Sequence, residues 1–212
     1  MSRSFITENH IKESIDFSEV MEQASAKEKR LNEQLKSLDQ SQQEDLNFLR
    51  LNNHRMRRVL KTYSVSPELR YGVEQIREPQ TWLVLSEDFC GDSAQSLPII
   101  SKMAELNPMI SLRILSRDDH LDLMDRYLTS GKRGIPKLIV IDKNFNEIFN
   151  WGPRPQEAAK VFIGSLESGK DEDEAYKDLH TWYAKDRGKA IEAEFIEVLS
   201  QIIVEKEGVL AA

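Results

Sequence analysis

The chain has 212 residues, of which 31% are charged and 40% are hydrophobic, a balance typical of a globular protein. Its formal net charge of −7 argues against general binding of nucleic acid, which needs a basic surface. The single cysteine excludes an internal disulfide, the four histidines show no metal-ligand spacing, and no apolar run reaches the ~18 residues of a membrane span. We therefore expect a cytoplasmic protein with no metal, no cofactor, and neither nucleic acid nor membrane as a partner.

Two helices are expected in an α-helical N-terminal extension over residues 1–65. Asp16, with Glu19 three residues later, resembles a helix N-cap, and the helix would run to about Leu38. A second helix would begin at the capping-box pattern of Ser41 and Glu44 and end near residue 62. The first helix has a narrow apolar stripe of Leu31, Leu35 and Leu38. The second helix presents one face made of Leu46, Leu49, Asn53 and Met56. The pair predicts a helical hairpin packed on the core, with a homodimer through these helices as the alternative.

An α/β core is expected over residues 66–170. Ser66 caps a short helix that begins at Pro67. The later elements are a strand at 81–86, a helix at 92–106, a strand at 111–116, a helix at 119–130, a hairpin of strands 137–142 and 147–150, and a helix at 155–168 that covers the sheet. The first strand–helix–strand unit predicts a parallel pair, and the hairpin makes the central sheet mixed. Two further helices, divided at Gly188, form a C-terminal extension over 171–212 packed on the core.

Cys90 lies where the first core strand gives way to a helix. Unpaired N–H groups and the helix dipole at that position favour the thiolate, which is the reactive form of cysteine. Glu87, Asp88 and Asp92 carry negative charges within a few residues and oppose it. The two effects are of similar size once solvent screening is included, so the sequence predicts a thiol of moderate acidity.

Three spacings around Cys90 resemble those of the thioredoxin fold. Pro98 follows Cys90 by eight residues, where the family has a kinking proline in the helix. Ile135 and Pro136 stand at the start of an apolar strand, where the family has a β-branched residue and a cis-proline. Gly152 follows Pro136 by sixteen residues, where the family closes its hairpin with glycine. The resemblance covers roughly residues 66–170, and the flanks are similar to bacterial thioredoxin-like proteins with a helical N-terminal extension.

The resemblance implies a thioredoxin-like fold with helical extensions at both ends and a groove beside the thiol that holds an extended partner chain. The residues that it assigns to this groove are Phe89, Gly91, Asp92, Ile135, Pro136, Trp151 and Gly152. Trp151 fits core packing equally well.

The active-site motif departs from the family pattern at three positions. Phe89 replaces the tryptophan, Ser93 replaces the second cysteine, and the apolar Val84 replaces a buried acid. Ser93 either donates a hydrogen bond to the thiolate or is an ordinary serine at a helix start. The Cys-x-x-Ser motif excludes the dithiol cycle, so Cys90, assisted by Ser93, would exchange with a protein or low-molecular-weight disulfide and be released by an external thiol.

Two other functions compete with monothiol exchange. One is a non-catalytic binding or adaptor module that uses the same groove and the helical arms. The other is a monothiol glutaredoxin, which Cys90-Gly91-x-Ser93 faintly resembles, although Asp92 stands in place of that family's phenylalanine.

Two further clusters are interpreted as structural. Arg55, Arg57, Arg58 and Lys61 fit a solvated helix C-terminus better than a phosphate-binding patch. His180, Trp182 and Tyr183 share one helix, and packing against the core is favoured over a small-molecule site.

Overall fold

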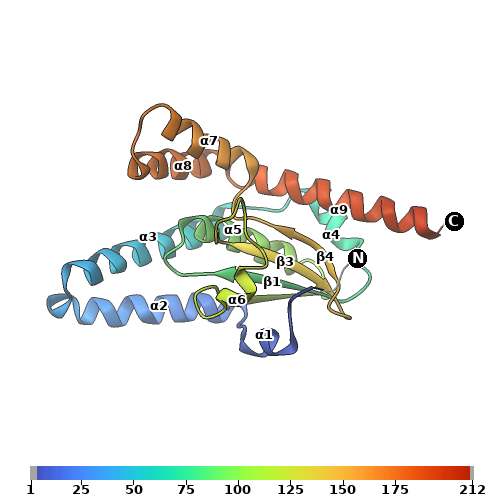
Figure 1. Ribbon diagram of the computed structural model, residues 1–212, viewed down its shortest axis with the longest axis horizontal. Helices are drawn as coiled ribbons and strands as arrows, with labels where there is room; N and C mark the ends of the chain where they lie inside the picture. The colour runs from blue at the N-terminus through green and yellow to red at the C-terminus, as the bar shows by residue number, and fades with distance from the viewer. Residues whose placement is uncertain (1–3, 211–212) are drawn as a thin grey trace.

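A four-stranded mixed sheet forms the centre of the protein (Figure 1). The computed structural model describes residues 4–210, the last six of them only as helical backbone, so the ends of both predicted extensions lie outside the described residues. The strands are β1 (Gln80–Ser86), β2 (Ile110–Ser116), β3 (Lys137–Asp142) and β4 (Glu147–Trp151), in the order β2-β1-β3-β4. β1 pairs with β2 in parallel and with β3 antiparallel, and β3 pairs antiparallel with β4. This architecture confirms the predicted α/β class.

Helices surround the sheet and extend beyond it. They are α1 (Glu8–Glu13), α2 (Phe17–Glu33), the 3₁₀ turn η1 (Leu35–Ser37), α3 (Gln40–Thr62), α4 (Pro67–Glu74), α5 (Gly91–Ala104), α6 (Leu121–Met124), α7 (Gln156–Glu167), α8 (Glu172–Asp186) and α9 (Lys189–Leu210). Among the described residues, none of these helices combines the length and the apolar character that crossing a membrane requires.

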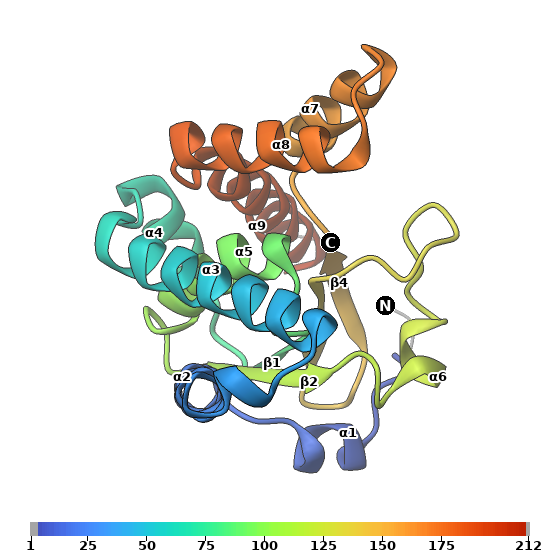
Figure 2. The same ribbon diagram turned by 90° about the vertical axis from the view of Figure 1, so that its left-hand side faces the viewer.

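Each face of the sheet has its own buried cluster. Alternation along β1 sends Trp82 and Val84 to one face and Leu83 and Leu85 to the other. The first face forms the larger cluster, which draws on α2, α3, α4, α5 and α9 (Figure 2). The second is smaller and is covered by α6 and the N-terminal segment. The larger cluster contains residues from Phe17 to Leu199, so both extensions share one core with the sheet.

The α2–α3 hairpin packs along α5, and its distal end projects away from the sheet (Figure 1). The face expected for the second helix is confirmed: Leu46, Leu49, Asn53 and Met56 are all buried. The Asn53 side-chain amide donates to the Ala24 carbonyl at 3.2 Å and so links α3 to α2.

The first helix of the hairpin differs from its prediction. Its start is confirmed, because Asp16 and Glu19 form a reciprocal capping box. It ends at Glu33 rather than Leu38, and Leu35 is 41% exposed. The second helix is capped by Asp39 with Gln42, two residues before the expected pattern of Ser41 and Glu44.

The N-terminal segment also protects an edge of the sheet. Ile15 pairs with Ile114 of β2 through two backbone hydrogen bonds of 2.9 and 2.7 Å. An unpaired edge strand is prone to pairing with other chains, and this bridge covers part of β2. The same bridge fixes where α2 begins relative to the sheet.

Two expectations for helices are wrong. The helix expected at 119–130 is the single turn α6, followed by an irregular segment. The helix expected to cover the sheet, α7, instead pairs with α8 around a separate small cluster. α9 covers the sheet in its place, because Ile191, Phe195 and Leu199 form a continuous buried face against Trp82 and its neighbours.

Candidate thiol site

Cys90 is the N-cap residue of α5, reached from β1 through the turn Glu87–Phe89. The Ser93 N–H donates to the Cys90 Sγ at 3.4 Å, which is the capping interaction of this helix. The thiol donates to the Ile135 carbonyl oxygen at 3.2 Å. Cys90 as a residue is partly exposed, and its sulfur lies between a helix terminus and the loop before β3.

The loop facing the thiol is shaped by Pro136 and Gly152. The Ile135–Pro136 bond is cis, which is the isomer expected from the sequence spacing, and Gly152–Pro153 is cis as well. Gly152 has a φ of +111°, and a Cβ there would lie 2.1 Å from the Pro136 carbonyl oxygen. Only glycine fits such an approach, so Gly152 lets β4 close against the Pro136 loop. Ile135 thus contacts Cys90, and Pro136 and Gly152 shape the loop that presents it.

Two of the residues expected in the groove, Trp151 and Phe89, differ in their surroundings. Trp151 is 8% exposed and packs on Phe195, with ring centroids 5.6 Å apart. Its indole N–H donates to Glu194 at 2.6 Å, so its side chain belongs to the core that α9 forms. Phe89 is 50% exposed, and the Arg117 guanidinium lies over its ring at 5.6 Å. Phe89 is thus on the surface next to the thiol, whereas Trp151 is not.

Ser93 is 2% exposed, and its backbone N–H donates to the thiol sulfur. Its hydroxyl oxygen accepts a hydrogen bond from the Ser86 hydroxyl at 2.8 Å. The side chain thereby links the end of β1 to the first turn of α5. It lies one helical turn from Cys90, the position that a second cysteine would need.

Asp92 is a buried carboxylate with two strong partners. It accepts from Arg154 Nη2 and from the Tyr183 hydroxyl, each at 2.6 Å. Burial raises the pKa of Asp92, and the contacts with Arg154 and Tyr183 offset part of that rise. Asp92 thus ties the start of α5 to the loop after β4 and to α8, rather than lining an open groove.

His180 and Arg55 pack over Gly91. A Cβ at Gly91 would lie 2.6 Å from the His180 ring and 3.1 Å from Arg55 Nη1, so glycine leaves room for both. Burial, followed by the charges of Arg55, Arg154 and Arg58, lowers the pKa of His180 to about 3, so the ring is neutral at neutral pH. Arg154, Tyr183, His180 and Arg55 were not among the predicted site residues. The clusters containing Arg55 and His180 were visible in the sequence, but their proximity to Cys90 is a long-range feature.

Burial raises the pKa of the Cys90 thiol, and the Asp92 charge raises it further. Hydrogen bonds from Ser93 and from the Asp92 backbone lower it in part. The prediction of a thiol of moderate acidity considered only the helix dipole and the nearby carboxylates. It did not include the loss of water around the sulfur, which raises the pKa. The structure corrects that expectation: Cys90 is a weaker acid than an ordinary cysteine.

Replacing Asp92 with asparagine is expected to lower the Cys90 pKa, because it removes the charge that opposes the thiolate. As pH is increased, the rate of iodoacetamide alkylation of Cys90 should begin to rise at a lower pH in the variant than in the wild type. Both proteins are measured at a temperature where they are folded. Asp173→Asn, an exposed carboxylate in the first turn of α8, serves as the control and should leave the profile in place. An unchanged profile in Asp92→Asn would mean that Asp92 does not act on the thiol.

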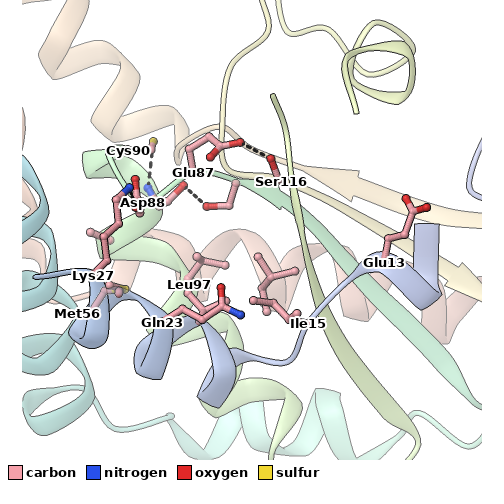
Figure 3. A pocket seen from close by; sticks show the side chains of 16 residues that line it. Glu13, Ile15, Gln23, Lys27, Met56, Glu87, Asp88, Cys90, Leu97 and Ser116 are labelled. Atoms are coloured by element: carbon pink, nitrogen blue, oxygen red, sulfur yellow. Dashed lines mark hydrogen bonds and ion pairs between the residues drawn. The ribbon is translucent and has the colours of Figure 1, made fainter. Parts of the chain in front are cut away.

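A cavity of about 430 Å³ opens beside Cys90 (Figure 3). In the view of Figure 3, Cys90, Glu87 and Asp88 lie along its upper side, and Met56 and Leu97 lie below. The rest of the lining is Glu13, Ile15, Val20, Gln23, Ala24, Lys27, Ser86, Ser93, Ala94, Ile114 and Ser116. α2 and the segment before it supply one wall, so the N-terminal hairpin helps to form the surroundings of the thiol. Within the part of the chain that the structure describes, no group of three potential metal ligands comes together.

A family model described as Thioredoxin matches residues 39–177, from the cap of α3 into α8. The chain belongs to the thioredoxin family. The match does not include α1, α2 or α9.

Two solved structures are similar to this chain. A crystal structure of an HIV epitope scaffold has 18% sequence identity and a TM-score of 0.62, with 93% of this chain and 98% of that chain covered. A crystal structure of a protein of unknown function from Pseudomonas aeruginosa has 21% identity and a TM-score of 0.54, covering 72% of this chain and 86% of that chain. At these identities the likeness concerns the fold alone. No curated protein matched the sequence.

Proposed function

We propose that this protein carries out thiol–disulfide exchange through the single thiol of Cys90 and is released by an external thiol. The observation that carries the proposal is the position of Sγ, at the N-terminus of α5 and 3.2 Å from the carbonyl of Ile135, next to Pro136. An extended partner chain beside Pro136 would bring its own disulfide to this sulfur.

The exchange takes place in two balanced steps. Cys90 loses its proton to water, and the thiolate attacks one sulfur of a disulfide; a Cys90 mixed disulfide forms while the other sulfur leaves as a thiolate and takes up a proton. A second thiolate from solution then attacks the mixed disulfide, and Cys90 leaves as a thiolate. In sum, one disulfide and one external thiol become a new disulfide and the released thiol, and Cys90 is regenerated, so no further oxidant or reductant is consumed. Because its pKa is raised, Cys90 is largely protonated at neutral pH, and the first step is slow.

The test is intact-protein mass spectrometry after the folded protein is mixed with bis(2-hydroxyethyl) disulfide. We expect one adduct per chain, located at Cys90, which persists until a small thiol is added and then disappears. Cys90→Ser is the control and should gain no mass. A wild-type protein that gains no adduct while folded would exclude thiol exchange.

A non-catalytic binding module is the second candidate, and the raised pKa of Cys90 favours it. In that role the Ile135–Pro136 loop would pair with an extended segment of a partner, and the thiol would only fill space. A chain of this kind resists modification at Cys90 while folded, so the same experiment separates the two functions.

The proposal places the protein in the cytosol, where thiols stay reduced and an external thiol is present to complete the cycle. A homodimer through the N-terminal helices is proposed as a separate property. Leu46 and Leu49 are buried within the chain, so such an interface would use the exposed Leu35, Phe48 and Leu51. Dilution of the protein during light-scattering measurements of its mass tests this proposal.

A further inference from the structure

The cavity beside Cys90 has the size of a small-molecule site. Its volume of about 430 Å³ lies within the ~300–1,000 Å³ of typical ligand pockets. Cys90 is one of the residues that line it, so a molecule bound there lies beside this residue. One wall comes from α2 and the preceding segment, which the family model does not match, so the cavity depends on a part of the chain beyond the family core.

One side of the cavity is apolar. Its aliphatic and thioether side chains come from four different elements and from the segment before α2. They are Ile15, Val20, Met56, Leu97 and Ile114. This side suits a short hydrocarbon portion of a ligand rather than a second charged group.

The charged groups at the cavity favour a cation. Three carboxylates, Glu13, Glu87 and Asp88, line it together with one ammonium group, that of Lys27. Lys27 is paired with Asp88 at 2.5 Å, and no basic side chain of the described residues is within ion-pair distance of Glu87. The Glu87 carboxylate instead accepts from the Ser116 hydroxyl and the Asp118 N–H, each at 2.9 Å, which fixes its position.

Two other groups bear on this charge balance. The His120 ring forms a hydrogen bond with Glu13 at 2.8 Å. Burial lowers the pKa of His120, but the contact with Glu13 raises it, and the net shift of the pKa is upward. The ring therefore offsets part of the Glu13 charge. Arg55 lies across Gly91, on the α3–α8 side of the thiol, and does not line the cavity. The net charge that a ligand meets inside the cavity is therefore negative, set chiefly by Glu87.

We propose that this cavity binds one half of a small aminothiol disulfide: a short aliphatic chain that carries a protonated amine and ends at the sulfur that Cys90 attacks. The amine lies against the carboxylate side, the aliphatic chain against the apolar side, and the sulfur at Sγ. Cys90 thiolate joins this sulfur, and the other half of the disulfide leaves as a thiolate and is protonated by water. This inference rests on the proposed function and adds a substrate class to it.

The experiment compares three small disulfides of similar length on the full-length protein. Cystamine carries two ammonium groups, bis(2-hydroxyethyl) disulfide is neutral, and 3,3′-dithiodipropionate carries two carboxylates. Each rate of adduct formation at Cys90 is divided by the rate for the same chain unfolded in urea, which removes differences in intrinsic reactivity. We expect cystamine to exceed dithiodipropionate by about tenfold in low salt, with the ratio shrinking in high salt.

Three variants test whether the charged groups of the cavity cause the faster reaction with cystamine. Glu87→Gln retains a side-chain acceptor for Ser116 and should reduce the cystamine preference severalfold. Lys27→Met removes the ammonium group and should increase it. Glu167→Gln, an exposed carboxylate at the end of α7, is the matched control and should leave the ratio unchanged. Equal corrected rates for the three disulfides, or faster reaction of the anionic one, would overturn the inference.

Binding without chemistry separates this inference from the proposed function. Cystamine is titrated into Cys90→Ser, and the NMR signals of the methyl groups of Met56 and Ile114 report on the cavity. Saturable shifts with cystamine but not with dithiodipropionate support the cavity's charge preference even if Cys90 proves unreactive. If Cys90 reacts but these methyl signals do not respond, the proposed function stands and the cavity is not its substrate site.

Discussion

Ser93→Cys is expected to turn a protein with almost no insulin-reductase activity into one with measurable turnover. In the wild type, a mixed disulfide at Cys90 can be resolved only by a thiol from solution. A second cysteine at position 93 would attack it from within the chain, and well-positioned intramolecular groups act at effective molarities of roughly 10⁵–10⁸ M. The Ser93 N–H already contacts the Cys90 Sγ at 3.4 Å, so the position is adjacent to the sulfur.

The size of the gain is limited by the surroundings of position 93. Val84 is buried in β1 and offers no acid to help the second thiol ionise, and the hydrogen bond between Ser86 and the side chain at position 93 would weaken. We therefore expect activity well above the wild-type background but a slow turnover. Ser96→Cys is the control: it adds a cysteine to the same helix, six residues from Cys90 and about 9 Å along the axis, too far to reach the sulfur. Equal activities of the two variants would show that α5 does not hold position 93 against Cys90.

Gly152→Ala is expected to destabilise the protein by roughly 3–5 kcal/mol, from a backbone conformation disfavoured for alanine combined with a steric clash. The added methyl group would lie 2.1 Å from the Pro136 carbonyl oxygen, and a backbone atom cannot move aside as a side chain can. The free energy of unfolding in urea measures the effect. The Pro136 loop faces Cys90, so reactivity at the thiol should change as well.

Substitutions at two other glycines separate the effect of the steric clash from that of the backbone conformation. Gly131 has a φ of +74°, and a methyl group added there would meet no atom of the described residues within 4 Å, so Gly131→Ala should show conformational strain alone, about 1–2 kcal/mol. Gly164 lies inside α7 with open space around it, and Gly164→Ala should stabilise the protein by about 0.5–1 kcal/mol. If Gly152→Ala were no worse than Gly131→Ala, the close approach to Pro136 would not be important for stability.

The features predicted from sequence are those that local backbone geometry specifies. Cys90 follows a strand and caps a helix, Pro136 begins the next sheet strand, and Gly152 fits where no side chain does. Such requirements act within a few residues of each position, or at a fixed spacing along one hairpin. The strand–helix junction indicated Cys90 directly, whereas Pro136 and Gly152 were identified by their resemblance to the spacings of the thioredoxin family.

The features that were not predicted depend on contacts between distant segments. The sequence presents Asp92 as an anion near the thiol, but Arg154 and Tyr183 surround it with partners 62 and 91 residues away. The roles of α7 and α9 differ from expectation for a similar reason, since both are amphipathic and only packing decides which one covers the sheet.

The cavity is another feature that depends on contacts between distant segments and was not predicted. The hairpin of α2 and α3 was expected to pack on the core, and it does so through residues such as Phe17 and Met56. Nothing in its periodicity indicates that α2 also stops short of filling the space next to Cys90. Ile15 pairs with Ile114 of β2 just before α2 begins, and both residues line the cavity together with Cys90.

The most direct measurement of the central claim is the rate at which Cys90 exchanges with a small disulfide in the folded protein, compared with the rate in urea at the same pH. A cysteine that serves only as packing reacts when the chain unfolds, so its rate falls in proportion to the unfolded fraction, by a factor of roughly 10³ or more for a stable domain. Thiol exchange as proposed here predicts a folded rate slowed by the raised pKa alone, and unaffected by mutations that change global stability, such as Gly164→Ala. A folded rate that follows the free energy of unfolding from one variant to the next would contradict it.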